Sequence, residues 1–351
     1  LHSYHTSFID EEMTHNKMST FHTYQEIDIA SLDSEGSVVG IGNFDGVHQG
    51  HLALINAVVK KSLETGLNAS ILTFDPHPLR FFKGARGPLQ LYSSQDRESL
   101  LAQLGIQVVL TQQFDLSFGS LSPQAFVEEV LVKSLRAAHV VVGYDFAFGA
   151  QRAGTHQDLL RLSQDHGFHV EVIEAQRSIG EGEDRPFSST WIRELVSSGE
   201  VERAAEALGR PYHVRGDVIR GLQRGRSLGF PTANLHLSSE LCPAPGVYGG
   251  WLDWGSGPQK SVISIGNNPT FNDAHIPDNH QRWSVEVHVL QPDFPREVEL
   301  YGRGVTLWFS GRLREMIRFS NIEQLIEQIT QDCQHARMSL KTAPSFFVSE
   351  R

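Results

Sequence analysis

The stretch SVVGIGNFDGVHQGH, residues 37–51, predicts how the first half of this chain folds. Its opening residues are apolar enough for a buried strand, and a glycine-containing loop then leads into an amphipathic helix at residues 52–63. Glycine lets a backbone approach a phosphate group, and the start of a helix supplies unpaired N–H groups with about half a positive charge. The order of strand, glycine loop and helix therefore predicts a phosphate-binding site.

Two histidines, His48 and His51, stand at the end of this loop with Gln49 and Gly50 between them. Imidazoles at this spacing can contact one phosphate chain, donate hydrogen bonds to it and, when protonated, add positive charge to a transition state. Such a site needs no covalent step. The alternative is an ordinary strand-to-helix turn that carries two histidines by chance.

Strand-like runs alternate with amphipathic segments through the rest of the first half. After the strand at residues 37–41, further strands are expected at residues 69–74, 107–111, 138–143 and 168–173. Repeated βα units predict a parallel sheet wrapped by helices, with ligands at the carboxyl ends of the strands. A helix at residues 190–208 is expected to close this half, because Gly209, Arg210 and Pro211 would stop it.

The second half shows a different apolar period, that of strands separated by glycine and proline. The expected strands are residues 212–219, 246–253, 260–265, 283–290 and 305–309. An antiparallel barrel is the expected way to close them. The last helix is predicted to begin at Ser320, to complete a capping box with Glu323, and to turn Ile322 and Cys333 toward the barrel.

Composition narrows the possible functions. The 351 residues include 41 acidic and 30 basic side chains, a formal net charge of −11, so nucleic acid is not an expected ligand. No apolar run approaches the ~20 residues of a membrane-spanning helix, which favours a cytoplasmic protein. Two distant cysteines, Cys242 and Cys333, indicate reduced thiols rather than a disulfide. The polar residues 1–17 are predicted to be a disordered extension.

Four motifs follow one another in the first half: GNFDGVHQGH at 42–51, TFDPHP at 73–78, VGYDFAFG at 142–149 and SSTWIR at 188–193. In this order they resemble the adenylyltransferase half of the bacterial bifunctional riboflavin kinase/FMN adenylyltransferase family, which implies a Rossmann-like nucleotidyltransferase sheet. The resemblance implies that His48 and His51 hold the ATP phosphates. The other ATP-binding residues it implies are Gly42, Asn43, Asp45, Gly50, Ser189, Thr190 and Arg193.

The third motif is expected to face the flavin or the nucleotide. The resemblance places Asp145 and Phe146 there, although Phe146 and Phe148 fit a role in the hydrophobic core equally well. Ala147 departs from the family, in which arginine is frequent. This departure concerns the flavin side and leaves the predicted ATP site unaffected.

The second half carries GFPTAN at residues 229–234, the signature string of riboflavin kinases. The resemblance implies a kinase barrel with a terminal helix, and ATP binding by Gly225, Arg226, Gly229, Phe230, Thr232 and Asn234. The Thr232 hydroxyl and the Asn234 carbonyl are oxygen ligands of the kind that Mg²⁺ accepts beside nucleotide phosphates.

The strand motif VEV, residues 285–287, supplies the implied catalytic base of the kinase. By resemblance Glu286 takes the proton from the ribityl 5′-hydroxyl of riboflavin. Arg314 is expected on the flavin side, with an ion pair to a surface carboxylate as the alternative. Asn268 and Gln291 depart from the residues common in the family at the same side of the site.

The resemblance runs from residue 37 to residue 337 and implies two domains. Residues 18–203 would be an FMN adenylyltransferase, or FAD synthetase, and residues 204–345 a riboflavin kinase. Riboflavin and ATP would give FMN, and FMN with a second ATP would give FAD and pyrophosphate, with Mg²⁺ as cofactor. The expected partners are these small molecules, with neither nucleic acid nor membrane, and the chain is expected to be a monomer or a weak homo-oligomer.

Two other functions stay open at this point. The same sheet could serve another acceptor, such as pantetheine phosphate or nicotinate mononucleotide, with the barrel as a passenger. Alternatively, the barrel could sense a ligand or bind nucleic acid without catalysis. The kinase string disfavours the first, and intact Thr232, Asn234 and Glu286 in an acidic chain disfavour the second.

Overall fold

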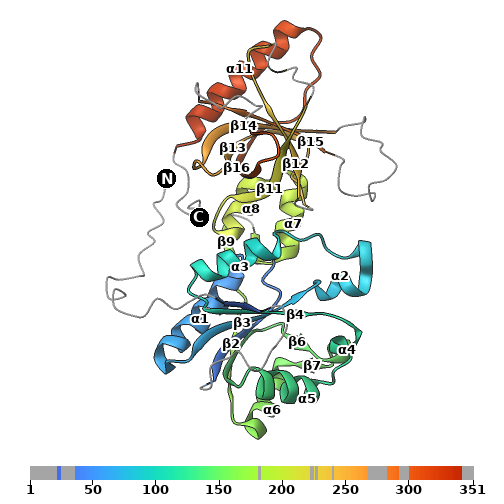
Figure 1. Ribbon diagram of the computed structural model, residues 1–351, viewed down its shortest axis with the longest axis vertical. Coiled ribbons are helices and arrows are strands. Elements are labelled where there is room, and N and C mark those ends of the chain that lie inside the picture. The colour runs from blue at the N-terminus through green and yellow to red at the C-terminus, as the bar shows by residue number, and fades with distance from the viewer. Residues whose placement is uncertain are drawn as a thin grey trace.

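The computed structural model describes residues 22–24, 36–180, 183–221, 225, 228–238, 241–267, 283–291 and 300–341. Within these residues a helix-covered parallel sheet and a closed barrel lie at opposite ends of an elongated molecule, with two helices between them (Figure 1). The predicted extension at 1–17, together with Arg226 and Asn268, lies outside the described residues.

The described residues of the first half form a six-stranded sheet in the order β1-β4-β3-β2-β5-β8, with every pair of neighbours parallel. The strands are β1 (His22–Tyr24), β2 (Ser37–Ile41), β3 (Asn68–Asp75), β4 (Val108–Gln113), β5 (Ala137–Gly143) and β8 (His169–Ile173). The five predicted strands are confirmed, and β1 was not predicted. Because the chain runs from β2 through β3 to β4 and then returns to β5 on the other side of β2, the sheet has its switch point between β2 and β5.

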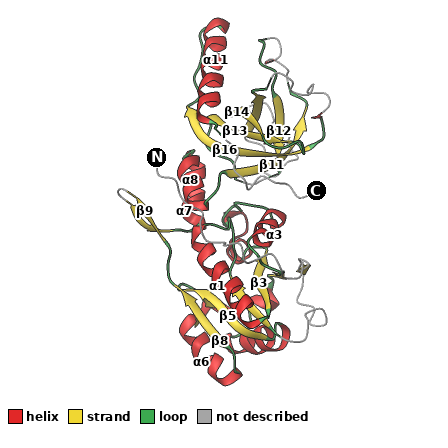
Figure 2. Ribbon diagram, turned by 90° about the vertical axis from the view of Figure 1, so that its left-hand side faces the viewer, coloured by secondary structure: helices red, strands yellow, loops and turns green. Residues whose placement is uncertain are grey.

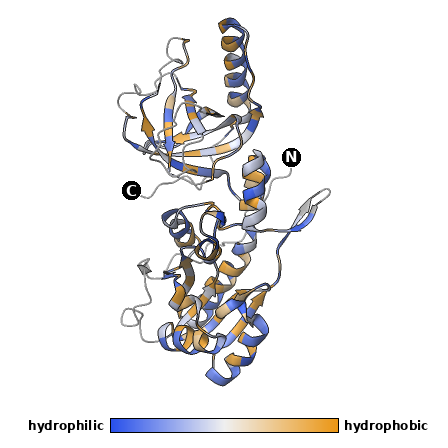
Figure 3. Cartoon of the chain, turned by 90° about the vertical axis from the view of Figure 1, so that its right-hand side faces the viewer, coloured by the Kyte–Doolittle hydropathy of each residue, from blue (hydrophilic) through white to orange (hydrophobic). Residues whose placement is uncertain are grey.

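Helices cover both faces of this sheet (Figure 2). They are α1 (Gln49–Thr65), α2 (Pro78–Lys83), α3 (Ser94–Gln103), α4 (Leu116–Gly119), α5 (Pro123–Ala125), a π-helical segment (Phe126–Ser134) and α6 (His156–His166). Short hairpins β6 (Ala147–Phe148) with β7 (Gly154–Thr155), and β9 (Arg177–Gly180) with β10 (Glu183–Pro186), complete the half. Hydrophobic and hydrophilic residues alternate along the covering helices, which turn one side to the sheet (Figure 3).

The single helix predicted at residues 190–208 is wrong. The chain forms two helices, α7 (Ser189–Ser198) and α8 (Val201–Leu208), because Gly199 ends the first in the left-handed conformation with φ of 84°. A Cβ on Gly199 would lie 2.7 Å from the hydroxyl oxygen of Tyr248, a residue of the barrel. Glycine therefore both breaks the helix and lets the barrel pack against the break.

The second half is a closed barrel in the order β11-β12-β15-β14-β13-β16, as described residues show. Its strands are β11 (Tyr212–Ile219), β12 (Ala233–Leu237), β13 (Gly246–Asp253), β14 (Gln259–Asn267), β15 (Trp283–Val289) and β16 (Gly304–Arg314). The predicted barrel is confirmed, whereas β12 was not predicted as a strand. Tyr212, Tyr248 and Phe309 are fully buried and pack as neighbouring rings.

The last helix, α11 (Ile322–Ser339), packs its second half on the barrel. Cys333 is buried there as predicted, in a cluster with Val247 and Trp251. The predicted capping box is wrong by one residue, because the side chain of Asn321 accepts the hydrogen bond from the N–H of Gln324 at 2.9 Å. Ile322 is 59% exposed rather than packed, because the buried contacts of α11 begin further along the helix.

One hydrophobic cluster joins the two halves. It contains buried residues of α7 and α8, residues of the barrel interior, and Leu91 and Tyr92 from the first half. Asp96 of α3 pairs with Arg215 of β11, and Glu202 of α8 accepts from the backbone N–H of Arg312 at 2.8 Å. Among the described helices, none combines the length and the apolar character needed to cross a membrane.

Candidate active sites

A pocket of about 1300 Å³ opens at the switch point of the parallel sheet. It is lined by the loop that follows β2, by the segment that follows β5, and by the first turn of α7. Small-molecule pockets usually measure roughly 300–1,000 Å³. This pocket is therefore large enough for two nucleotide-sized substrates side by side.

Most residues predicted for the first site line this pocket. They are Gly42, Asn43, His48, Gly50, His51, Asp145, Phe146, Ser189, Thr190 and Arg193. Asp45 differs, because its side chain is 5% exposed and lies behind the loop. The motifs that carry the family resemblance thus identified the wall of the pocket, and Asp45 belongs to the structure that supports it.

The loop after β2 has an unusual backbone. Phe44, Gly46 and Val47 all have positive φ angles, of 49°, 85° and 41°. A β-branched residue such as Val47 rarely adopts this conformation, which persists only where surrounding groups hold it. The buried side chains of Phe44 and Val47, both 0% exposed, are part of that support.

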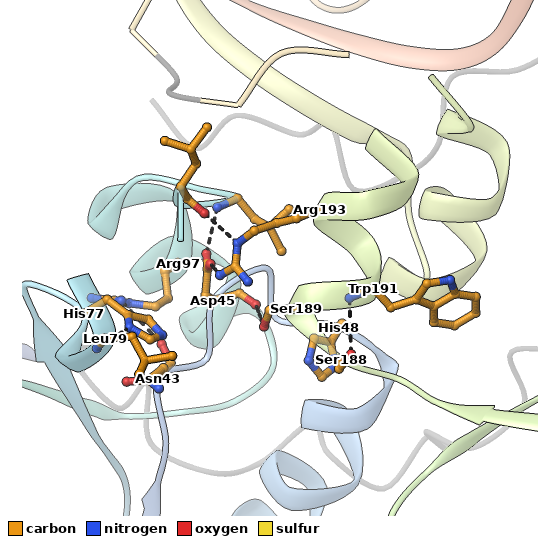
Figure 4. Close-up of polar contacts among 12 residues, drawn as sticks. Asn43, Asp45, His48, His77, Leu79, Arg97, Ser188, Ser189, Trp191 and Arg193 are labelled. Carbon is orange, nitrogen blue, oxygen red and sulfur yellow. Dashed lines mark hydrogen bonds and ion pairs between the residues drawn. The ribbon is translucent and has the colours of Figure 1, made fainter. Parts of the chain in front are cut away.

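Asp45 holds the loop through several hydrogen bonds. Its carboxylate accepts from the backbone N–H of Leu91 at 3.0 Å and pairs with Arg193, and its carbonyl accepts from the Ser189 hydroxyl at 2.8 Å. Figure 4 shows Asp45 between Arg193 and Ser189, which both belong to α7. The aspartate therefore ties the loop to the second helix N-terminus of the pocket.

His48 and His51 lie together at the start of α1. Their ring centroids are 3.6 Å apart and nearly parallel, with 17° between the planes. The backbone N–H of His48 donates to Nδ1 of His51 at 3.3 Å, so the ring proton of a neutral His51 sits on Nε2. Nδ1 of His48 is buried and has no hydrogen-bond partner among the described residues. Both rings line the pocket, so the pair can bond to a ligand there.

Both histidines are neutral near pH 7. Burial, followed by the guanidinium groups of Arg210 and Arg193, lowers the pKa of His48 to about 3. Burial, the neighbouring His48 and Arg210 also lower the pKa of His51 well below 6.5. Of the two roles predicted for these side chains, hydrogen-bond donation fits the ligand-free site, and positive charge has to come from other residues.

The first turn of α7 provides the second anion-binding element. Ser188 is the N-cap residue and accepts from the backbone N–H of Trp191 at 3.2 Å, while Ser189 and Thr190 line the pocket. Two helix N-termini, of α1 and α7, therefore face one cavity. Such an arrangement favours a polyphosphate group.

Several pocket residues were not predicted as site residues. Lys83, Arg86 and Arg152 add positive charge to the lining. Arg97 does not line the pocket and instead supports its loop: it is 4% exposed and donates to the carbonyl of Asn43 at 3.4 Å. Arg152 follows the motif at residues 142–149, although no site role was assigned to it. No local motif marks Lys83, Arg86 or Arg97, and the nearest signal for them was the charge requirement of a polyphosphate in an acidic chain.

Aromatic side chains form another part of the wall. The phenylalanines in the lining are Phe44, Phe74, Phe82, Phe114, Phe118, Phe126, Phe146, Phe148 and Phe187. Phe148 is 6% exposed and belongs to the sheet core, and Phe146 stacks on it at 5.4 Å while also facing the pocket. The core alternative therefore applies to Phe148. The apolar wall suits a flat ring system.

The second predicted site lies on the outer face of the barrel. Asn234 of β12 is paired in register with Glu286 of β15, whereas the next pair, Ala233 and Val287, is fully buried inside. Since side chains alternate along strands, Asn234 and Glu286 point outward together. Two residues before Asn234, Thr232 is half-buried beside the same strand pair.

Glycines bring the preceding loop against these side chains. A Cβ on Gly221 would lie 2.1 Å from the amide nitrogen of Asn234, and one on Gly225 would lie 3.2 Å from the Thr232 hydroxyl. The backbone N–H of Phe230 donates to the carbonyl of Gly225 at 2.9 Å. The structure therefore gathers Gly225, Phe230, Thr232, Asn234 and Glu286, and Gly229 completes the turn with a φ of 88°.

Two further residues concern this site. His288, which was not predicted, follows Glu286 by two positions, contacts the Phe230 ring edge-on at 5.6 Å and bonds to the Pro231 carbonyl at 2.8 Å. Arg314 lies at the end of β16, where its guanidinium bonds to the buried carboxylate of Asp332 at 2.7–3.1 Å. The alternative stated for Arg314 was a pair with a surface carboxylate, whereas Asp332 is 3% exposed, and the flavin role of Arg314 stays a prediction.

The geometry defines a class of protein: a nucleotidyltransferase sheet joined to a barrel with a glycine-loop phosphotransfer site. Comparison with known proteins agrees. The family model for FAD synthetase matches residues 30–190, and the model for riboflavin kinase matches residues 208–340. The two models thus correspond to the sheet half and the barrel half.

Relatives match nearly the whole chain. The bifunctional riboflavin kinase/FMN adenylyltransferase of Listeria monocytogenes is 35% identical over 91% of this chain and 98% of its own length. The protein of the same name from Escherichia coli strain K12 is 34% identical over 87% and 93%. A crystal structure titled macrolide-efflux protein, from Streptococcus pneumoniae, matches with a TM-score of 0.76 and 27% identity over 90% of this chain and 98% of that one. The chain belongs to the family of bifunctional riboflavin kinase/FMN adenylyltransferases.

Proposed function

We propose that the chain makes FAD in two ATP-dependent steps at two separate sites. The barrel phosphorylates riboflavin to FMN, and the sheet half transfers the adenylyl group of a second ATP to FMN, releasing pyrophosphate. The observation that carries the proposal is the large pocket at the switch point, with two helix N-termini and a neutral histidine pair, in a chain that also carries the outward Asn234–Glu286 pair.

In the adenylyl transfer, an oxygen of the FMN phosphate attacks the α-phosphorus of ATP, and the bond to the pyrophosphate oxygen breaks. Negative charge accumulates on the departing pyrophosphate. His48 and His51 donate hydrogen bonds to the phosphates, the N–H groups of α1 and α7 add their partial charges, and Arg193 adds a full charge. Positioning and electrostatics supply the catalysis without a covalent enzyme intermediate.

In the kinase step, Glu286 takes the proton of the ribityl 5′-hydroxyl while that oxygen attacks the γ-phosphorus of ATP, and ADP leaves. The loop that contains Gly225 and Gly229 covers the ATP phosphates. Arg226 belongs to this predicted group, and it lies outside the described residues.

Magnesium fits the oxygen donors of the barrel site. The Thr232 hydroxyl and the Asn234 amide oxygen would hold Mg²⁺ together with the ATP phosphates, which matches its preference for a few protein oxygens. Within the described residues, no group of three or more His, Cys, Asp or Glu side chains could hold a metal alone, so the nucleotide would complete the site. When bound, Mg²⁺ neutralises part of the phosphate charge.

The remaining expectations are part of the same proposal. The two functions divide the chain at residues 18–203 and 204–345, a boundary that falls within α8. The net charge of −11 argues against a nucleic-acid ligand. Both cysteines are free, which suits the cytoplasm, and the chain acts as a monomer or a weak homo-oligomer.

One assay tests the proposal directly. The purified chain is incubated with riboflavin, ATP and Mg²⁺, and the flavins are separated over time. FMN should appear first and FAD later, with ADP released in the first step and pyrophosphate in the second. Failure to convert riboflavin to FMN, or supplied FMN to FAD, would remove the corresponding half of the proposal.

A further inference from the structure

Arg210 lies in the turn between α8 and β11, where the chain passes from the sheet half to the barrel. Its guanidinium donates to the carbonyl of Val47 at 2.8 Å, to the carbonyl of Gly46, and to the carbonyl of Leu208 at 3.1 Å. Arg210 and Val47 are 163 residues apart in the sequence. An arginine outside all the matched motifs of the first half thus contacts the loop of the first active site.

The contacted segment includes a residue with a strained backbone, Val47. Gly46 and Val47 have positive φ angles, and Val47 directly precedes His48, the N-cap residue of α1. A backbone in this conformation relaxes unless neighbouring groups hold it. Because the two carbonyls accept from one rigid guanidinium, they are held in a defined relative orientation.

Arg210 is itself held in place. Its guanidinium lies over the Tyr92 ring at 5.1 Å, and that ring stacks on His213 of β11 at 4.3 Å. Gly209, with φ of 76°, lets Gln49 approach, since a Cβ there would lie 2.2 Å from the side-chain nitrogen of Gln49. The turn before the barrel therefore fits closely against the start of α1.

We propose that Arg210 is a positioning residue for adenylyl transfer: by bonding to the carbonyls of Gly46 and Val47, it sets the loop that presents His48 and His51 to the ATP phosphates. The residue does not line the pocket and acts through the loop. The inference rests on the proposed adenylyltransferase function of the sheet half. It also means that the sheet half depends on a residue from the connection into the barrel.

The charge of Arg210 supports the same role. It is one of the groups, after burial, that lower the pKa of both His48 and His51. Its guanidinium therefore adds to the effect of burial, which is the main cause that keeps the two rings neutral. Misplacing reacting groups by about 1 Å can reduce a rate ~100-fold.

The test compares Arg210→Ala and Arg210→Lys with Arg203→Ala in the full chain. Arg203 is a matched control, since it is a partly exposed arginine of α8 that pairs with Glu200. Both reactions are measured for each variant, FMN to FAD and riboflavin to FMN. Arg210→Ala should lower kcat of adenylyl transfer by roughly 10- to 100-fold with a smaller change in KM for ATP. Kinase activity and the control variant should stay within about twofold of wild type.

Two further measurements separate positioning from general stability. Arg210→Lys should recover part of the lost kcat, because an ammonium group can bond to one carbonyl at a time. Guanidinium ion at a non-denaturing concentration should partly restore Arg210→Ala and leave Arg203→Ala unchanged. The kinase reaction in the same chain reports that the variant is folded.

The outcomes distinguish this inference from the proposed function. If wild type makes FAD and Arg210→Ala matches Arg203→Ala, the positioning role is wrong and the function stands. If the two activities of Arg210→Ala fall together, with no rescue by guanidinium ion or lysine, Arg210 is merely structural and the inference is overturned. If wild type itself fails to adenylylate FMN, the proposed function fails first.

Discussion

At the scale of single residues, the stacked pair of His48 and His51 shows how two side chains can bind phosphate although both imidazole rings are uncharged before the ligand arrives. Burial keeps both rings neutral, so folding does not have to bury two imidazolium groups side by side. A bound polyphosphate brings its own negative charge, which favours protonation and strengthens the hydrogen bonds. The guanidinium of Arg193 supplies permanent charge from the neighbouring helix.

Replacing His51 should separate the two activities. In His51→Ala the pocket loses the Nε2–H donor while the barrel is untouched, so riboflavin should be converted to FMN and no further. Loss of one donor to a developing charge typically reduces kcat ~100- to 1,000-fold. Flavin separation after incubation with ATP measures this, and His335→Ala, at an exposed position on α11, is the control. Normal FAD production by His51→Ala would contradict the assigned role.

The complementary change is Glu286→Gln. Glutamine keeps the shape of the side chain and cannot accept a proton, so phosphorylation of riboflavin should fall ~100- to 10,000-fold. Supplied FMN should still be converted to FAD at the wild-type rate, because the sheet pocket is unchanged. The measurement is the rate of each step with its own substrate. A kinase that keeps most of its activity in Glu286→Gln would exclude this carboxylate as the base.

Residues joined by local spacing were predictable, and residues joined by folding were not. His48 and His51 lie within one turn at the start of α1, and Thr232 directly precedes strand β12, which carries Asn234, so their proximity follows from elementary geometry. Arg97, Arg210 and the charged lining of α2 reach the first site from distant segments with ordinary local sequences. Their role emerges once the sheet order and the packing of α8 are known.

At the scale of elements, Gly199 connects a helix end to the barrel. Gly199→Ala should destabilise the chain by about 1–3 kcal/mol, because alanine strains the left-handed backbone and its Cβ meets the Tyr248 hydroxyl. Gly167→Ala is a matched control, since Gly167 ends α6 with φ of 74° and has no atom within 4 Å of the added Cβ. Urea unfolding measures both variants. Equal losses would show that the contact with Tyr248 contributes nothing.

Elements with strong apolar periodicity matched their predictions, and weakly patterned ones did not. The five predicted sheet strands and five barrel strands all exist, although β16 is longer than expected. β12 carries Asn234 and His236 on its outer face and begins within the GFPTAN motif, so its sequence was interpreted as a loop and not as a strand. β1 has three residues, too few for any pattern, and forms by pairing with β4. Pairing with neighbouring strands, and not the local sequence pattern, therefore makes β1 and β12 strands.

At the scale of the whole molecule, the two halves share a core as well as a chain. Asp96 of the sheet half is 5% exposed and faces both Arg215 and His213 of β11. Burial alone would raise the pKa of Asp96, but the hydrogen bonds from His213 and Ser93 and the charge of Arg215 hold that pKa well below 3.8. The carboxylate therefore stays charged at the junction. Folding of each half should depend on contacts with the other.

Buried histidines should make the stability of the molecule fall in mild acid. Burial is the leading cause that lowers the pKa of His48, His51 and the junction residue His213 below 6.5 in the folded state. Below about pH 6.5 the unfolded chain binds protons that the folded chain does not, so the free energy of unfolding decreases as pH falls. For His48 alone, with a folded pKa of about 3, the loss at pH 5 is about 2 kcal/mol.

Urea unfolding at pH 7 and at pH 5 measures this loss. The pKa of Asp96 is below 3.8 in the folded chain and near 3.8 in the unfolded chain, so Asp96 changes the free energy of unfolding mainly below about pH 5. A comparison between pH 7 and pH 5 therefore reports on the histidines. His48→Asn should reduce the decrease between the two pH values by about 2 kcal/mol, since asparagine does not titrate. His335→Asn, which removes an exposed histidine of α11, should leave the decrease unchanged. Identical decreases in wild type and both variants would mean that His48 is not held neutral by the fold.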